Sequence, residues 1–182
     1  MLDVAQSLVQ TRGFNGFSFR DLAAAIGVKS ASIHYHFPSK SDLGVALVRR
    51  YRREFEDAIS TAEGRHNSAP ARLKAFVEIF RANLTEDRLC LCGMLGAERD
   101  SLPPEVAAEV RDFFAFCEDW LTTQMRQGRQ ESTLGFADSP QATAWQLLAL
   151  LEGGLVVARN LGELARFDKA LSCFLRGLKP VP

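Results

Sequence analysis

Residues 17–43 constrain the fold more than any other part of this chain, because they contain two short helical patterns separated by a tight turn. Ser18 is an expected N-cap of the first helix. Gly27 is expected to end that helix, since glycine adopts a positive φ without strain. The apolar face between them consists of Leu22, Ala23 and Ile26. Two helices in this spacing predict a helix-turn-helix, which places its second helix in the DNA major groove.

The second helix of the pair presents a polar side and an apolar side. We expect Val28 and Ile33 to fill the core between the two helices. The hydrogen-bonding side chains left facing outward are Ser30, Ser32, His34 and Tyr35. Their position favours contact with base edges or phosphates.

These residues resemble a known signature. The run Ile26-Gly27-Val28, followed by Ser-Ile-His-Tyr-His-Phe-Pro-Ser-Lys-Ser-Asp-Leu at 32–43, is similar to that of the TetR family of transcriptional regulators. Residues 2–8 with Gly13-Phe14 resemble the first helix of that family. The resemblance covers about the first quarter of the chain. It is specific because the His-Phe-Pro-Ser-Lys run follows the helix-turn-helix at this spacing.

The charge distribution agrees with a DNA-binding N-terminus, although the net charge of the whole chain is zero. Residues 1–53 hold eight Lys and Arg against three Asp and Glu, a net charge of +5. The remainder therefore carries −5. A positive patch attracts the phosphate backbone, and an acidic remainder discourages the rest of the chain from lying on DNA.

The remaining sequence is helical in periodicity, and strand patterns are nearly absent. The pattern predicts an all-α fold of about nine helices, with a three-helix DNA-binding domain at 1–46 and a larger helical domain at 47–182. A long fourth helix is expected from near Ser39 to about Ala62. The TetR resemblance implies the same organisation, in which the second domain dimerises and holds an inducer. It also implies a homodimer on a palindromic operator of double-stranded DNA, acting most often as a repressor.

Nine residues are candidates for DNA contact. The base-reading candidates are Lys29, Ser30, Ala31, Ser32 and His34, since Lys bonds guanine and Ser is a permissive partner. The resemblance implies phosphate contacts from Tyr35, His36 and Lys40, and Arg20 joins the basic set. The family often has a small capping residue where this chain has Lys29, so the second helix begins either after Lys29 or one residue later, with Ser30 as its cap.

The second domain is where the resemblance places a small, mostly apolar effector. Candidate lining residues are Phe76, Phe80, Cys90, Cys92, Phe113, Phe116, Cys117, Trp120, Trp145, Leu148 and Glu152. Aromatic residues at helical spacing form either a cavity wall or ordinary core. Gly153-Gly154 in an apolar helix favours either a close helix contact at a dimer seam or a kink beside the pocket.

Cys90 and Cys92 allow a second route to regulation. Two thiols in a short, glycine-containing segment are candidates for an electrophile or oxidant sensor, with Arg88 nearby. The alternative is that both are buried and act as small hydrophobic side chains.

Other function classes lack support in the sequence. No nucleophile–base–acid spacing, phosphate loop or metal-ligand cluster is recognisable, so we expect no enzyme activity, no cofactor and no metal. No export signal and no unbroken apolar run of about 20 residues is visible, so we expect a cytoplasmic protein without membrane partners.

Overall fold

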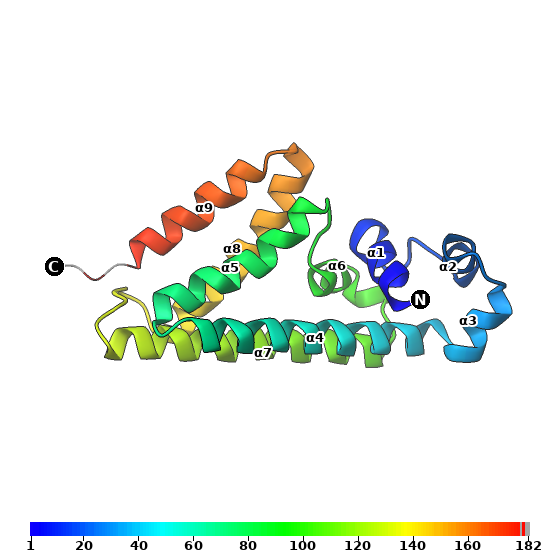
Figure 1. Cartoon of the computed structure of the whole chain (residues 1–182), viewed down its shortest axis with the longest axis horizontal. Coiled ribbons are helices and arrows are strands. Elements are labelled where there is room, and N and C mark those ends of the chain that lie inside the picture. The colour runs from blue at the N-terminus through cyan, green and yellow to red at the C-terminus, as the bar shows by residue number, and fades with distance from the viewer. Residues whose placement is uncertain (179, 181–182) are drawn as a thin grey trace. The chain divides into compact units, whose positions relative to one another are not determined.

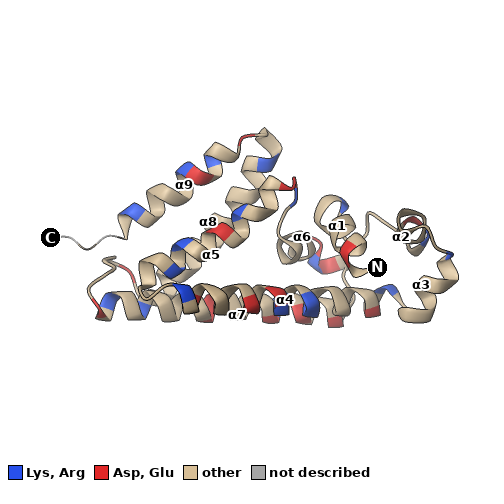
Figure 2. Cartoon of the chain, viewed as in Figure 1, with Lys and Arg blue, Asp and Glu red and all other residues tan. Residues whose placement is uncertain are grey.

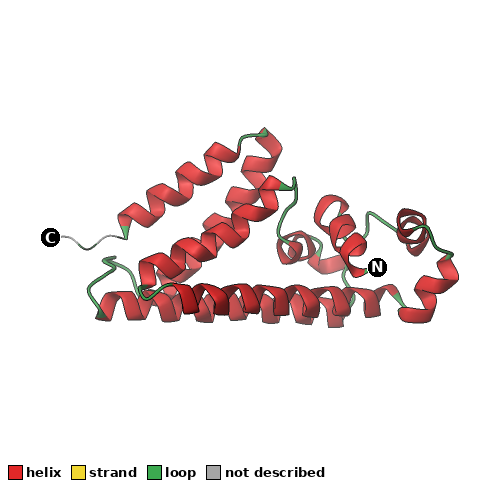
Figure 3. Cartoon of the chain, in the orientation of Figure 1, coloured by secondary structure: helices red, strands yellow, loops and turns green. Residues whose placement is uncertain are grey.

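The computed structural model describes residues 1–178 and 180, and every regular element in them is helical (Figures 1 and 3). The α-helices are α1 (Leu2–Arg12), α2 (Phe19–Ile26), α3 (Ser30–His36), α4 (Lys40–Arg65), α5 (Ala69–Thr85), α6 (Leu91–Ala97), α7 (Pro104–Gln130), α8 (Pro140–Leu161) and α9 (Leu164–Gly177). A short 3₁₀ turn, Arg99–Ser101, precedes α7. The predicted all-α fold is confirmed.

The chain forms two compact units. Met1–Glu54 and Arg88–Phe113 make up the first unit, and Phe55–Asp87 and the residues from Phe114 onward make up the second. Helices α4 and α7 contribute residues to both units. A functional boundary at residues 46 and 47 stays a prediction.

Local capping explains where the helices of the first unit begin and end. The Ser18 hydroxyl accepts from the Asp21 amide, and the Asp21 carboxylate accepts from the Ser18 amide, which completes a capping box at the start of α2. Ser39 and Asp42 repeat this arrangement at the start of α4. Gly27 has φ +81° and ends α2 in the left-handed conformation. The predicted roles of Ser18 and Gly27 are confirmed.

Two local expectations are wrong. Val28 does not fill the core, because its side chain is 41% exposed, while Ile33 alone is fully buried in α3. Helix α4 continues to Arg65 rather than ending near residue 62, since Gly64 is accommodated inside its last turn. Helix α3 begins at Ser30 after Lys29, whose side chain makes no capping hydrogen bond.

The segment after α5 returns to the first unit and packs on α1. The Gln10 side chain donates to the Leu89 carbonyl at 2.8 Å. The Glu98 carboxylate accepts from both the backbone and the side-chain nitrogens of Asn15, at 3.0 and 2.8 Å. These bonds attach α6 and the turn after it to α1 and to the loop that leads into α2.

The second unit is built on α5, α8 and α9. Pro140 in the first turn and the Ser139 hydroxyl, which accepts from the Ala142 amide, define the start of α8. Arg81 of α5 makes two hydrogen bonds to Asp168 of α9, at 2.7 and 3.0 Å. A Cβ on Gly154 would lie 3.1 Å from the Phe167 ring, so this glycine permits the close approach of α8 and α9 within one chain.

Helix α8 is, by length and composition alone, the one helix in the described residues that could cross a membrane. Polar residues such as Gln146 and Glu152 interrupt its apolar residues, so it contains no unbroken apolar run of that length. Much of its apolar character belongs to a face buried inside the second unit, where Leu147, Leu151 and Leu155 are fully buried. The composition of α8 therefore has an explanation in the packing of this unit.

Candidate DNA interface and effector domain

Helix α3 presents almost its whole surface to solvent. Ile33 is its one buried residue, and Tyr35 is 84% exposed. Ala31, Ser32, His34, Tyr35 and His36 are all exposed, as is Lys29 before the helix, and Ser30 is half-buried. The predicted base-reading side chains, with Tyr35 and His36, therefore lie together on one short helix and at its start, whereas Lys40 begins α4.

The orientation of α3 is set by its contacts with α2. Ile33 of α3 and Leu22 and Ala23 of α2 are all buried in the first unit, and the two helices are in contact. The His34 ring packs edge-on against Phe19 with the ring centres 4.8 Å apart. Arg20, in the first turn of α2, is exposed. His34 therefore holds α3 against α2 in addition to its predicted role toward DNA.

The Lys40 ammonium group is more enclosed than that of a lysine that only contacts phosphate. Its ammonium group donates to the Phe17 carbonyl and lies 4.9 and 4.6 Å from the ring centres of Phe14 and Phe17. Burial lowers the pKa of Lys40, against the opposing effect of Glu98 and Asp21. Lys40 thus joins the start of α4 to the loop between α1 and α2.

Part of the positive charge of the first unit is neutralised internally. Arg49 contacts Glu109 at 2.7 Å, and Arg50 pairs with Asp3 and with Glu54. These contacts raise the pKa of both guanidinium groups, chiefly through hydrogen bonds to the carboxylates. Acidic and basic residues are mixed along α4 and α7 in Figure 2. The cations on α2 and before α3, Arg20 and Lys29, are exposed.

Three of the predicted effector residues come together in the second unit. Trp120 stacks on Phe76 with ring centres 5.0 Å apart and planes 10° apart, and Phe80 lies 5.3 Å from Phe76. Phe55 completes this aromatic cluster with edge-on contacts to Phe76 and Phe80. The indole nitrogen of Trp120 donates to the Glu63 carboxylate at 2.8 Å. Neither Phe55 nor Glu63 is among the predicted effector residues. The helical spacing of apolar residues marks Phe55 as part of the apolar face of α4, but no local pattern marks Glu63.

The other candidates are distributed more widely. Phe116 and Glu152 are half-buried, Cys117 and Leu148 are buried, and Trp145 is 48% exposed on α8. Cys90, Cys92 and Phe113 belong to the first unit and are fully buried. There the Tyr51 hydroxyl donates to the Cys90 sulfur at 3.6 Å, and the Tyr51 ring lies 5.5 Å from that of Phe113. In the described part of the chain, no cluster of three His, Cys, Asp or Glu residues could hold a metal ion.

A capped helix-turn-helix with an exposed polar second helix, joined to a larger helical unit, defines a DNA-binding regulator. Comparison with known proteins agrees. Residues 1–47 match the model of the bacterial regulatory proteins of the tetR family, and residues 69–174 match a tetracyclin repressor-like C-terminal domain. The chain belongs to the TetR family of transcriptional regulators, whose members are typically ligand-responsive repressors and generally not enzymes.

Solved structures of the family superpose closely on this chain. A TetR-family transcriptional regulator from Agrobacterium tumefaciens is 32% identical, with a TM-score of 0.95 over 98% of this chain and 95% of that one. A TetR regulator from Legionella pneumophila is also 32% identical, with a TM-score of 0.88 and the same coverage.

Two curated relatives are more distant in sequence. The nucleoid occlusion factor SlmA of Photobacterium profundum is 29% identical over 84% of this chain and 78% of its own length. The transcriptional repressor NemR of Escherichia coli is 23% identical over 94% of this chain and 88% of its own.

Proposed function

We propose that this regulator is a homodimeric repressor that binds a palindromic operator and is released by a small, mostly apolar effector. The observation that carries the proposal is the exposed surface of α3, on which polar and basic side chains gather around one buried anchor, Ile33. One such helix per chain requires two half-sites about one DNA turn, ~34 Å, apart. It also requires a dimer with two-fold symmetry.

An apolar surface on α8 supports the dimer. Trp145, Val156, Val157 and Leu161 are large apolar residues that are 47–53% exposed. Gly153 lies among them, is exposed, and has no atom within 4 Å of an added Cβ. Exposed apolar patches of this kind mark interaction surfaces. We place the seam on α8 and α9, where two copies form a four-helix interface.

The effector is proposed to act in the second unit, at the aromatic cluster of Phe55, Phe76, Phe80 and Trp120. Aromatic side chains favour apolar and aromatic ligands. The effector releases DNA only if it binds the DNA-incompetent arrangement more tightly than the competent one.

Thiol sensing through Cys90 and Cys92 is the second candidate. A reactive thiol needs access and an electropositive setting. Both sulfurs belong to residues with 0% exposure, so we favour the non-covalent route. We further propose a cytoplasmic location and a function without enzymatic activity, membrane partners or a cofactor.

A gel shift with DNA from the promoter region of its own gene tests this function. We expect a sequence-specific complex of two chains per site that survives competition by unrelated DNA. Binding that is equal on all DNA sequences, or a chain that stays monomeric on the operator, would contradict the proposal.

A further inference from the structure

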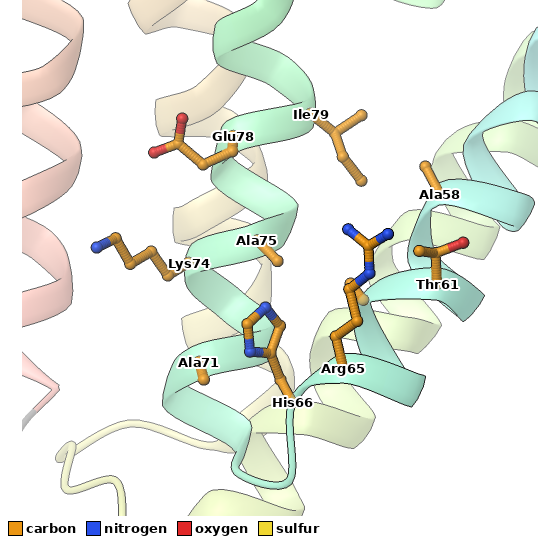
Figure 4. A pocket seen from close by; sticks show the side chains of 10 residues that line it. Ala58, Thr61, Arg65, His66, Ala71, Lys74, Ala75, Glu78 and Ile79 are labelled. Atoms are coloured by element: carbon orange, nitrogen blue, oxygen red, sulfur yellow. The ribbon is translucent and has the colours of Figure 1, made fainter.

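A groove opens between α4 and α5, with both of its walls inside the second unit (Figure 4). Its volume is about 530 Å³, within the range of small-molecule sites. Five of its ten lining residues are apolar, namely the small side chains Ala58, Ala62, Ala71 and Ala75, with Ile79 further along α5. These short side chains leave room for apolar atoms to lie against the two helices.

The side chains of one arginine and one histidine extend into this groove near the turn that joins α4 and α5. Figure 4 shows Arg65 and His66 pointing into the space between α4 and α5. Among residues 1–178 and 180, no carboxylate forms an ion pair with Arg65 or His66. The guanidinium group of Arg65 is therefore available to an incoming anion.

The nearest acid on the lining is directed elsewhere. Glu78 and Lys74 point to the opposite side of α5 in Figure 4, where they also line a neighbouring groove beside α9. The charge of Glu78 acts there on Arg81, whose pKa is raised first by its hydrogen bond to Asp168 and to a smaller extent by Glu78. The groove thus has an apolar floor and a positive end, without an acid facing Arg65.

The backbone at the positive end is held in place. The Arg72 side chain donates to the His66 carbonyl at 2.9 Å and to the Gln127 side chain at 3.2 Å. The His66 amide continues the α4 hydrogen-bond pattern to the Ala62 carbonyl at 3.0 Å. The two groove side chains, Arg65 and His66, therefore extend from a braced turn rather than from a free loop.

We infer that this groove binds a small amphipathic carboxylate. The carboxylate pairs with Arg65, whose planar fork matches its two oxygens, and His66 adds a further donor. The hydrocarbon part of the ligand lies against the alanine side chains of the groove and extends toward Ile79, where burial of apolar surface contributes affinity. This groove shares no lining residue with the aromatic cluster proposed for the effector, and the inference goes beyond the proposed function.

Calorimetric titration of the full chain with octanoate, and with octanamide as a neutral probe of similar size, tests the site. We expect octanoate to bind and octanamide to bind at least tenfold more weakly. Arg65→Gln and Ala75→Leu should each weaken octanoate binding at least tenfold, the first by removing the cation and the second by filling the floor. Arg126→Gln, at an exposed arginine of α7, is the matched control and should bind octanoate like the native chain.

Three results would overturn the inference: no octanoate binding to the native chain, equal binding of octanoate and octanamide, or unchanged octanoate binding by Arg65→Gln. Arg65 is exposed, so its substitution leaves the core packing intact. Operator binding by Arg65→Gln is measured in parallel. Retained operator binding with lost octanoate binding separates this site from the proposed DNA-binding function.

Discussion

The ammonium group of Lys40 is enclosed by the Phe17 carbonyl and the rings of Phe14 and Phe17, and it is also a predicted phosphate contact. We expect Lys40→Ala to weaken binding to operator and unrelated DNA by a similar factor. The slope of log affinity against log salt should fall by about one unit for each chain, and so by about two units for the dimer, because one phosphate contact per chain is lost. Titrations by fluorescence anisotropy at several salt concentrations measure both effects.

The enclosed position of Lys40 adds a control to that experiment. Thermal unfolding of the same variant reports the loss of the contacts with the loop between α1 and α2. If the variant has a lower melting temperature but the same dependence of DNA affinity on salt, Lys40 only stabilises the fold and does not contact phosphate.

Two glycines of α4 allow a matched test of packing against helix propensity. A Cβ on Gly44 would lie 2.7 Å from a Val106 methyl and 3.0 Å from the Phe14 ring, whereas Gly64 has no atom within 4 Å. We expect Gly44→Ala to lower the free energy of unfolding by about 1–3 kcal/mol through overpacking. Gly64→Ala should raise it by up to about 1 kcal/mol, because alanine is the better helix former.

Urea unfolding of both variants measures this difference. An equal gain in stability for the two substitutions would show that Phe14 and Val106 move aside at no cost, and that the contact at Gly44 does not restrict residue size.

Helix caps can be predicted from neighbouring residues in the sequence, whereas the burial of a single residue cannot. Ser18 and Gly27 are recognisable from sequence because a cap and a positive φ depend on neighbours within a few residues. The apolar character of Val28 predicts a place in the core, yet its side chain is 41% exposed in the turn between α2 and α3. Burial of one residue at a turn depends on helix packing and not on its own type.

At the scale of elements, α8 combines a buried face with an exposed apolar one. Leu151 and Leu155 are fully buried, while Val157 is 53% exposed. We expect Val157→Asp to shift the chain from dimer to monomer at micromolar concentration, since a charge at the centre of an apolar seam is desolvated without a partner. Operator affinity should fall with the loss of the second half-site.

Native mass spectrometry and analytical ultracentrifugation report the oligomeric state. Thr123→Asp, at an exposed position of α7, is the control and should remain dimeric. If Val157→Asp stays dimeric and binds the operator normally, the seam does not involve this face of α8.

At the scale of the whole molecule, regulation by a non-covalent effector and regulation by thiol sensing predict different effects of removing the Cys90 and Cys92 thiols. The double variant Cys90→Ser, Cys92→Ser should keep operator affinity and release by apolar effectors, because both cysteines are fully buried and neither belongs to α3 or to the aromatic cluster. If the non-covalent route holds, quinones should release this variant from DNA as effectively as they release the native chain.

A screen of aromatic and lipid-like compounds beside quinones and peroxide, scored by release of DNA, checks both routes together. Release of the native chain by quinones with no release of the double variant would establish Cys90 or Cys92 as the sensor. If no compound acts on either protein, the proposed effector class is wrong.

Short-range chemistry was sufficient to predict the all-α class, the helix-turn-helix and the residues of α3, since caps, turns and helical faces are determined within about one helical turn. The packing of segments distant in the sequence determined which helices and side chains come into contact. It attached the segments on either side of α6 to α1 and to the loop after α1 through Gln10 and Glu98, and it brought Phe55 against Phe76. These contacts join residues far apart in the chain, and no local pattern encodes which helix faces meet.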